Sequence, residues 1–347
     1  MERSLGGGRH DINFYDVISI SNLFTAWKTF RKGKQSKKDV ALFELTLEDA
    51  LFDLHNALLL GGWRPTPYTV FLIHDPKLRR IHKASVRDRI LYQAVYQILY
   101  QIFDKNFIFD SYSSRDLKGT HRAIKRFEES ARKVSFNYRK KAFAVKCDIR
   151  KFFDSIDHEI LCELIFQKIH DQQLQLLIQK IIGSFSTTPG KGLPLGNVTS
   201  QLFANIYLNE LDQFVKHHLK VEHYIRYCDD FVMVHESKEF LKKAVRSLQT
   251  YLQDSLKLEL HPCKVIFKAL HQGVDFLGFV SLPHYAVLRT KTKKRILKKI
   301  IALKKQLGAK TISKEKFEQV LQSYYGVLSH AQSFKIRQKI DVIIKSS

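Results

Sequence analysis

Two adjacent carboxylates, Asp229 and Asp230, lie between two runs that favour extended strands, 223–226 and 231–234. Strands joined in this way form a hairpin that carries both acids at its tip. Carboxylate oxygens are the ligands that Mg²⁺ and other hard divalent cations take in proteins. Paired acids are also ordinary solvated turn residues, so this pair alone leaves both interpretations open.

A third carboxylate favours the metal interpretation. Asp148 precedes Asp229 by 81 residues and lies near the end of the apolar run 143–149. This run predicts a buried strand, followed by a helix over 157–170. Two magnesium ions held about 4 Å apart by such acids can activate an attacking hydroxyl and neutralise charge on a leaving pyrophosphate. Asp148 and Asp229 are the expected bridging ligands. The alternative for Asp148 is a strand-end acid paired with a nearby Lys or Arg.

A glycine-rich turn over 190–201 lies between these acids in the chain and precedes a run with helical periodicity. Glycines without a Cβ let backbone N–H groups approach an anion or a flat base. The turn lacks the Gly-Lys-Thr/Ser ending of a Walker loop. An ordinary helix N-terminus capped by Asn197 or Thr199 is the competing interpretation.

The elements that must position these residues follow from hydrophobic periodicity. Helices are expected over 21–60 with a break at 31–38, then a hairpin over 67–85 with its turn at 74–76, and an amphipathic helix over 87–103. Strands and helices alternate through the middle of the chain, and the part from 291 onward reads as helical and basic. This order predicts an α+β core flanked by helical ends.

Charge indicates the partner. The formal net charge is +24, and residues 286–347 hold 16 Lys or Arg against three acidic residues, a local +13. Such a field binds polyphosphate or an anionic membrane. No apolar run has the length of a membrane span, and residues 1–10 lack the apolar core of a signal peptide, so nucleic acid is the expected partner and no membrane is expected. The four cysteines have no C-x-x-C spacing, so we expect neither zinc nor disulfides, and an intracellular chain.

Four motifs in order carry a family resemblance: Asp148 with Phe152-Phe153, Leu195-Gly196-x-x-x-Ser200-Gln201, Tyr227-Cys228-Asp229-Asp230, and Val274-Asp275-Phe276-Leu277-Gly278-Phe279. Together they resemble the palm of a reverse transcriptase. Leu195 stands where most of these enzymes have Gln, and Gln201 stands where they have Pro. This pattern resembles the reverse transcriptases of diversity-generating retroelements, within the group II intron and retron-like bacterial superfamily. Further similarity extends over 71–81, 87–89, 111–121 and 324–332.

The resemblance implies roles for individual residues. Asp148 and Asp229 match the metal-binding acids, Ile149 the residue that lends a backbone carbonyl, and Asp230 a third, less direct carboxylate. The cofactor would be two Mg²⁺ ions, with Mn²⁺ as an alternative. Lys264 matches a lysine that protonates the departing pyrophosphate, although a basic side chain on a surface strand is equally compatible with the pattern.

Other positions match the substrate site of the family. Phe153 would be a steric gate that selects deoxynucleotides, with core packing as the alternative for it or for Phe152. Arg79, Arg80 and Arg115 would grip the incoming triphosphate, because a guanidinium holds phosphate oxygens in a bidentate manner; for each one a solvated surface arginine is the alternative. The motif residues Leu195, Gly196, Ser200 and Gln201 would contact the nucleotide, and Phe276, Leu277 and Gly278 would support the primer terminus.

Leu195 has the volume of a Gln but no hydrogen-bonding group. Losing a polar contact worth about 1 kcal/mol would relax discrimination several-fold. The resemblance implies errors concentrated opposite template adenines.

The resemblance also implies a right-hand polymerase. Its parts would be an N-terminal helical extension (1–60), fingers (61–142), a palm with an antiparallel split βαβ sheet (143–284, with a finger insertion at about 158–188) and a basic helical thumb (285–347). The expected activity is RNA-directed DNA synthesis of adenine-mutagenised cDNA. Implied partners are template RNA, the RNA–DNA hybrid, deoxynucleoside triphosphates and a small basic oligomeric accessory protein. The implied location is the cytoplasm of a prokaryote, and the protein would be encoded by the prokaryote or by a phage. Alternatives are another bacterial reverse transcriptase (antiviral, retron or group II intron type) or a catalytically silent RNA-binding scaffold.

Overall fold

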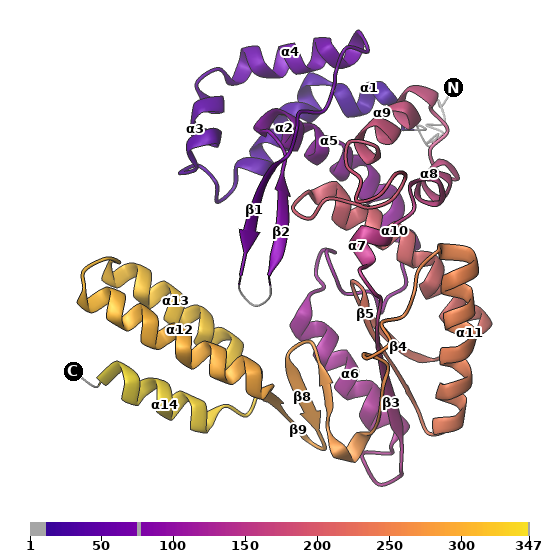
Figure 1. The fold of residues 1–347 in the computed structure, drawn as a ribbon, viewed down its shortest axis with the longest axis vertical. Coiled ribbons are helices and arrows are strands. Elements are labelled where there is room, and N and C mark those ends of the chain that lie inside the picture. Colours follow the sequence, from indigo (N-terminus) through magenta and orange to yellow (C-terminus); the bar gives the residue numbers. More distant parts are fainter. Residues whose placement is uncertain (1–11, 75–77, 346–347) are drawn as a thin grey trace, which may run out of the picture. The chain divides into compact units, whose positions relative to one another are not determined.

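A computed structural model describes residues 12–74 and 78–345 of the chain. The chain forms two compact units, each built from three separate segments (Figure 1). Among the described residues, the first unit comprises 12–74, 78–108, Ile149–Phe214 and Gln249–Glu259, and the second comprises Phe109–Asp148, Val215–Leu248 and 260–345. The helix α11 (Lys238–Leu256) contributes residues to both.

The first unit is mainly helical. Its longest helix, α5 (Val86–Phe103), begins at the N-cap Ser85, whose hydroxyl accepts the Asp88 N–H. Asp88 is completely buried, and its carboxylate accepts hydrogen bonds from Trp63 Nε1 and from Thr66, which removes the cost of burying a charge. The remaining helices are α1 (Phe14–Ile18), α2 (Ile20–Arg31), α3 (Lys38–Glu44), α4 (Leu47–Leu59), the short η1 (Asp104–Asn106), α7 (Phe152–Ser155), α8 (His158–Phe166), α9 (Gln172–Ile182) and α10 (Val198–Gln213).

A two-stranded antiparallel hairpin, β1 (Thr69–Ile73) with β2 (Arg79–Lys83), also belongs to the first unit. All five residues of β1 are exposed, as are the first two of β2. The sequence predicts the hairpin turn at 74–76, and residues 75–77 lie outside the described residues.

The second unit contains a four-stranded antiparallel sheet in the order β4-β5-β3-β6. The strands are β3 (Phe143–Asp148), β4 (His223–Tyr227), β5 (Asp230–His235) and β6 (Ile266–Ala269), and η2 (Phe214–His218) leads into β4. One face packs on α6 (Thr120–Val134), whose Phe127 and Ala131 join Ala144, Ile225 and Val232 in a buried core (Figure 1).

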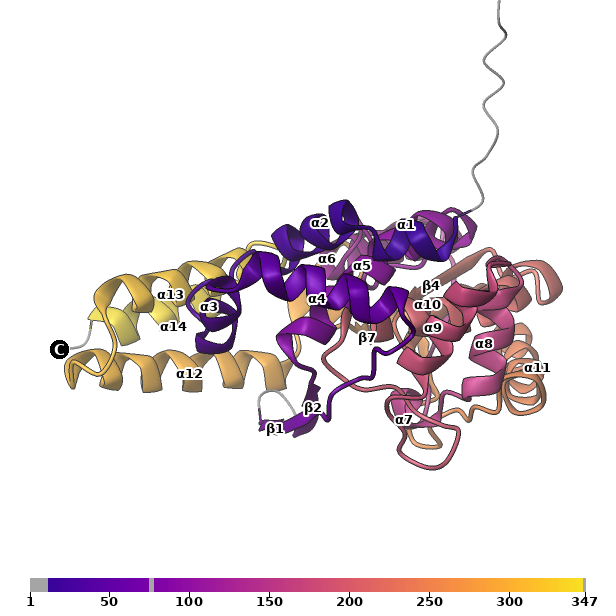
Figure 2. The same cartoon turned by 90° about the horizontal axis from the view of Figure 1, so that it is seen from above.

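A smaller sheet and three helices complete the second unit. The sheet has the order β7-β8-β9, formed by β7 (Val274–Phe276), β8 (Phe279–Leu282) and β9 (Tyr285–Leu288), with η3 (Leu270–Gln272) before it. The helices α12 (Thr290–Gly308), α13 (Lys314–Leu328) and α14 (Phe334–Lys345) pack together in both views (Figures 1 and 2). They bury Ile296, Ile300, Leu328 and Ile340 in a shared core. Most lysines of α12 are exposed, whereas Lys304 Nζ donates to the Ile343 carbonyl of α14.

Most sequence-based expectations for the elements are confirmed. The mixed α+β class, both hairpins, the helix break before residue 38 and the split sheet are all present. The helix expected over 157–170 is shorter, because α8 ends at Phe166 and Asp171 caps the separate helix α9 by accepting the Leu174 N–H. The division into extension, fingers, palm and thumb stays a prediction. No helix among the described residues is both long and apolar enough to cross a membrane.

Candidate active site

The acidic hairpin forms as the sequence predicts. Strands β4 and β5 pair from His223↔Val234 to Tyr227↔Asp230, which leaves Cys228 and Asp229 as the two turn residues. Cys228 adopts φ +56°, a left-handed conformation that is strained for a residue other than glycine. Below the turn, the completely buried Arg226 donates from Nη1 to the Cys228 carbonyl at 3.3 Å. Burial of the hairpin base therefore fixes the position of the acids.

The sheet brings the third acid to the same place. Asp148, the last residue of β3, lies directly opposite Asp230 on β5. Asp230 in turn begins β5 one residue after Asp229. The three carboxylates, which lie up to 82 positions apart in the chain, from Asp148 to Asp230, thus converge at one end of the sheet of the second unit.

These acids repel one another in a buried setting. Burial raises the pKa of Asp229, and the charge of Asp148 raises it further. Burial likewise raises the pKa of Asp230 to about 6, with Asp148 and Asp229 adding to the rise and Lys146 opposing it. An arrangement that destabilises its own negative charge in this way stabilises a bound cation.

Two lysines contact these acids. Lys264 Nζ lies 2.6 Å from Asp148 Oδ1, and its role as a proton donor stays a prediction. Lys146 Nζ lies 3.0 Å from Asp230 Oδ2, a contact that the sequence analysis missed. A signal for Lys146 exists in the sequence, because a residue two positions before Asp148 on a strand shares its face.

The donor chemistry fits a divalent metal. All three acids offer hard oxygen ligands, and Asp230 Oδ1 is buried with no hydrogen-bond partner among the described residues. Across 12–74 and 78–345, however, no three His, Cys, Asp or Glu side chains are arranged to hold a metal as they stand. Lys146 and Lys264 are the groups with which a cation would compete for the oxygens of Asp230 and Asp148. Ile149, the expected carbonyl ligand, is buried and begins the next segment of the first unit.

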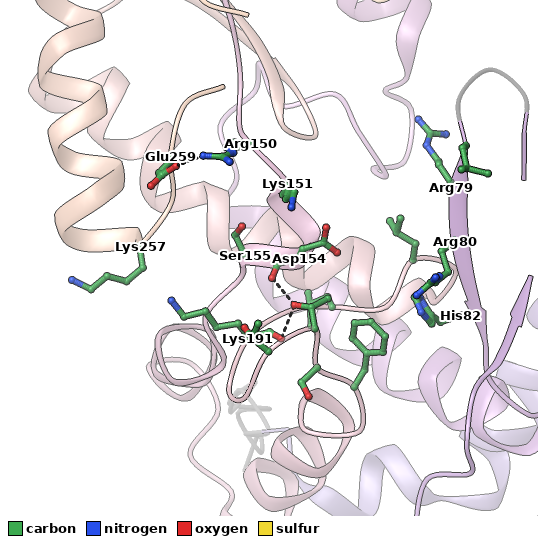
Figure 3. A pocket seen from close by; sticks show the side chains of 17 residues that line it. Arg79, Arg80, His82, Arg150, Lys151, Asp154, Ser155, Lys191, Lys257 and Glu259 are labelled. Carbon is green, nitrogen blue, oxygen red and sulfur yellow. Dashed lines mark hydrogen bonds and ion pairs between the residues drawn. The ribbon is translucent and has the colours of Figure 1, made fainter. Parts of the chain in front are cut away.

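The first unit holds a basic pocket with a volume of about 950 Å³ (Figure 3). It brings together three of the predicted substrate-binding residues, Arg79, Arg80 and Leu195. In Figure 3, Arg79, Arg80 and His82 extend from the hairpin, while Lys191 and Lys257 lie on the other side of the cavity. The charged residues of the lining are Arg79, Arg80, Arg150, Lys151, Lys191 and Lys257 against Asp154 and Glu259. This excess of positive charge suits a polyphosphate.

The glycine-rich turn docks on the hairpin at this pocket. The Leu195 carbonyl accepts the backbone N–H of His82 at 2.9 Å, and Gly196 adopts φ +122°. A Cβ at Gly196 would lie 2.9 Å from Ile81 Cγ2 and 3.2 Å from the His82 carbonyl oxygen. Only glycine therefore permits this close approach. Asn197 occupies the N-cap position of α10 without a side-chain capping bond, and its Nδ2 donates to the Tyr68 hydroxyl instead.

The other predicted contacts of the first unit lie on neighbouring elements. Phe152 is buried, whereas Phe153 is partly exposed, and its carbonyl accepts the Leu193 N–H at 2.7 Å. On α10, Ser200 is buried and Gln201 is exposed. The role of Phe153 as a gate and the roles of Ser200 and Gln201 stay predictions.

The remaining predicted residues belong to the second unit. Arg115 Nη1 donates to the Ser111 carbonyl at 3.1 Å. Phe276 is buried in the core beneath the main sheet, and the turn after it has positive φ at both Leu277 (+50°) and Gly278 (+90°). The Gly278 carbonyl accepts the Arg289 N–H, which ties this turn to the start of α12. Arg115 belongs to the second unit, whereas the pocket that holds Arg79 and Arg80 belongs to the first.

Comparison with known proteins identifies the family. Residues 74–281, more than half of the chain, match the model of the reverse transcriptase (RNA-dependent DNA polymerase) family. The chain therefore belongs to the reverse transcriptase family, and the predicted enzyme class, RNA-directed DNA polymerase, is confirmed at this level. The match begins within the hairpin β1–β2 segment and includes all three acids.

Individual relatives are distant. The chain is 25% identical to Protein YkfC of Escherichia coli (strain K12) over 265 residues, covering 65% of this chain and 69% of that protein. It is also 25% identical to the group II intron-encoded protein LtrA of Lactococcus lactis subsp. cremoris over 304 residues, covering 67% of this chain but 49% of LtrA. A telomerase structure from Candida tropicalis aligns with a TM-score of 0.49 and 13% identity, covering 67% of this chain and 59% of that one. The family assignment rests on the sequence match.

Proposed function

We propose that this chain copies a template RNA into DNA by two-metal nucleotidyl transfer. The observation that carries the proposal is the convergence of Asp148, Asp229 and Asp230 at one end of the sheet, with burial and mutual repulsion raising the pKa values of Asp229 and Asp230. Magnesium, when bound, would activate the primer hydroxyl and neutralise charge on the leaving pyrophosphate.

The proposal divides the remaining tasks among side chains of the chain itself. Asp148 and Asp229 act as the main metal ligands with Ile149 lending its carbonyl, and Asp230 is a third, less direct ligand. Lys264, in contact with Asp148, donates a proton to the leaving pyrophosphate. Arg79 and Arg80 hold the triphosphate, for which the excess positive charge of their pocket is suited.

We further propose that synthesis is error-prone opposite template adenines, as in a diversity-generating retroelement. The support is Leu195, an apolar side chain in a pocket otherwise rich in cations and hydroxyls. Its carbonyl already accepts the His82 N–H, and its side chain offers a nucleotide no hydrogen-bonding group. The cDNA would replace a variable gene segment, with a small basic accessory protein as partner, in a prokaryotic cytoplasm.

A second candidate is another bacterial reverse transcriptase, of the group II intron, retron or antiviral type. The similarity to LtrA, an intron-encoded protein, favours this candidate. Both candidates share the acids and differ in the fidelity of the product. A silent RNA-binding scaffold is disfavoured, because three mutually repelling, partly buried acids destabilise a fold that has no use for a cation.

The test is magnesium-dependent extension of a DNA primer on a mixed-sequence RNA template, with every product sequenced and Asp229→Ala as the control. Product that disappears in the control and carries errors opposite adenines supports both proposals. Accurate product keeps the polymerase and favours the second candidate. Failure to extend at any metal concentration, with folded protein that binds the template, contradicts the polymerase proposal.

Leu195→Gln tests the residue assigned to infidelity. Restoring a polar contact worth about 1 kcal/mol should lower misincorporation opposite adenine about fivefold. Leu195→Met is the matched control, because it keeps the volume without adding a donor or acceptor and should leave the error spectrum unchanged. An unchanged spectrum in Leu195→Gln would exclude this residue as the cause.

A further inference from the structure

Lys146 lies in the centre of the main sheet of the second unit. On β3 it is two residues before Asp148, so both side chains share one face of the strand. Its backbone partners are Val232 on β5 and Ile266 on β6. Its side chain is only 16% exposed, against 38% for Lys264. Lys146 is therefore flanked by strands on both sides, whereas Lys264 follows a turn at the sheet edge.

The contact that Lys146 makes is restricted to one oxygen. Its Nζ lies 3.0 Å from Asp230 Oδ2, while Asp230 Oδ1 is buried and has no hydrogen-bond partner among the described residues. A lysine ammonium is a compact point charge, unlike the arginine fork that grips both oxygens of a carboxylate. The two oxygens of Asp230 are thus made inequivalent by the protein itself.

Packing does not explain a lysine at this position. Its strand partners Val232 and Ile266 are apolar, and an apolar residue of similar volume would avoid the desolvation of a buried ammonium. A paired buried charge is better explained by what it does to its partner. Here the partner is a proposed metal-supporting acid.

We propose that Lys146 is a positioning residue that sets metal selectivity by making Asp230 a one-oxygen ligand. Mg²⁺ takes six ligands in octahedral geometry and accepts single carboxylate oxygens, whereas Ca²⁺ takes six to eight and readily binds both oxygens of one carboxylate. With Oδ2 held by Lys146, Asp230 can offer only Oδ1, which disfavours Ca²⁺ relative to Mg²⁺. This inference rests on the proposed function of the acids.

The test measures binding of MgCl₂ and CaCl₂ to the full chain by calorimetry, and the readout is the ratio of the two dissociation constants. Removing the charge of a lysine should strengthen the binding of both ions to the same extent. A change in the ratio therefore reports the Lys146–Asp230 contact and not the loss of charge. Lys146→Met should shift the ratio toward Ca²⁺ about tenfold, the lower end of what groups that orient metal ligands contribute. An unchanged ratio would overturn the proposal.

Lys264→Met is the matched control. It removes the same charge from the same group of acids, but Lys264 is more exposed and can move aside for a metal. The ratio of the two dissociation constants for Lys264→Met should stay within about twofold of the ratio for the unsubstituted chain. This change is smaller than the one expected when a fixed contact that orients a ligand is lost. An equal shift in both variants would show that charge, and not the Lys146 contact, sets the selectivity.

Lys146→Arg gives an independent test if Lys146→Met does not fold. The charge is kept, but the guanidinium fork can hold both Asp230 oxygens and remove Oδ1 from the metal. Binding of both ions should weaken, and unchanged dissociation constants would contradict the proposal. Primer extension by the unsubstituted chain is a separate readout that tests the proposed function. If the chain extends primers but Lys146→Met leaves the ratio of dissociation constants unchanged, only this inference is overturned. If the ratio shifts but the chain does not extend primers, only the proposed function is overturned.

Discussion

The chain contains two β-hairpins that present charge, and they do so under opposite physical conditions. The hairpin β4–β5 lies inside a four-stranded sheet, with its central residues buried on both strands. The hairpin β1–β2 forms a sheet of only two strands, and β1 is exposed along its whole length. The first presents acids and the second presents arginines.

The two environments, one buried and one exposed, suit charges of opposite sign. Burial at β4–β5 raises the pKa values of the acids and so builds electrostatic strain that a cation relieves. Exposure at β1–β2 leaves the arginines hydrated, which suits the capture of a charged ligand from solvent. An isolated two-stranded hairpin is only marginally stable. The hydrogen bond from the His82 N–H to the Leu195 carbonyl is therefore expected to stabilise β1–β2.

The largest expected effect is at the acidic tip. Asp229→Asn should reduce primer extension by at least about 10³-fold, because metal stabilisation of the transition state is worth several kcal/mol. Its thermal stability without metal should rise, since the neutral amide no longer suffers the burial and the repulsion by Asp148 that raise the Asp229 pKa. Asp53→Asn, on the exposed face of α4, is the surface control for both measurements. Activity within tenfold of the unsubstituted chain would contradict the assignment.

The next effect concerns the attachment of β1–β2. Gly196→Ala should lower the free energy of unfolding by about 2–4 kcal/mol, from the positive φ and the contact of the new Cβ with Ile81 and His82. Gly190→Ala is the matched control: φ is also positive (+73°), but nothing lies within 4 Å of the added Cβ, so only about 1 kcal/mol is expected. Chemical denaturation measures both, and equal losses would show that the close approach to the hairpin does not matter.

The arginines should give a smaller effect, confined to substrate binding. Arg79→Ala should raise the KM for deoxynucleotides about 10–100-fold, the equivalent of a charged hydrogen bond worth 1.5–3 kcal/mol. Stability should not change, because both Arg79 and Arg80 are exposed. Arg80→Ala is the comparison within the same strand and should have the weaker effect. A larger effect of Arg80→Ala would reverse the order inferred from the motif register.

The smallest effect is a pair of opposed pH dependences. The pKa of His82 is lowered by burial and by Arg80, so its contribution to stability is present above the unfolded pKa near 6.5 and is lost as the pH falls through that value. The pKa of Asp230 is raised to about 6, so its contribution is present below the unfolded value and is lost as the pH rises through 6.

Between pH 6.5 and 4.5, acidification should therefore loosen β1–β2 and tighten β4–β5, with the Asp230 contribution amounting to roughly 2 kcal/mol. Amide hydrogen exchange of the two hairpins in EDTA, corrected for intrinsic rates, measures both changes. His82→Gln and Asp230→Asn should each remove one of them. Changes of the same sign in both hairpins would contradict the opposite pH dependences expected for β1–β2 and β4–β5.

The sequence predicts more of the acidic hairpin than of the basic pocket, for a physical reason. Strand periodicity and adjacent acids are local signals, so Asp229, Asp230 and the end of β3 at Asp148 follow from short runs of residues. The pocket draws on four separate segments around residues 78–82, 150–155, 185–195 and 257–259. No local pattern relates Lys191 or Lys257 to Arg79.

Two contacts show the limits within the acidic site itself. Lys264 was expected from its motif, and its contact with Asp148 is observed. Lys146 shares the face of Asp148 by simple alternation, but the strand register that brings it to Asp230 depends on long-range pairing. Arg226 is completely buried, which its charge alone would not suggest.

The interleaving of the two units has a consequence for biosynthesis. Each unit takes its residues from three separate stretches, and the first is not complete until residue 259 has been made. Multidomain chains commonly fold their N-terminal domain first as it leaves the ribosome. This protein cannot fold in that order, because its first unit includes residues that are made after two of the three segments of the second unit. The strand β6, which pairs with the strand that ends in Asp148, is synthesised later still. The edges of β3 must therefore stay unpaired until β5 and β6 have been made, which makes chaperone demand a hazard of its expression.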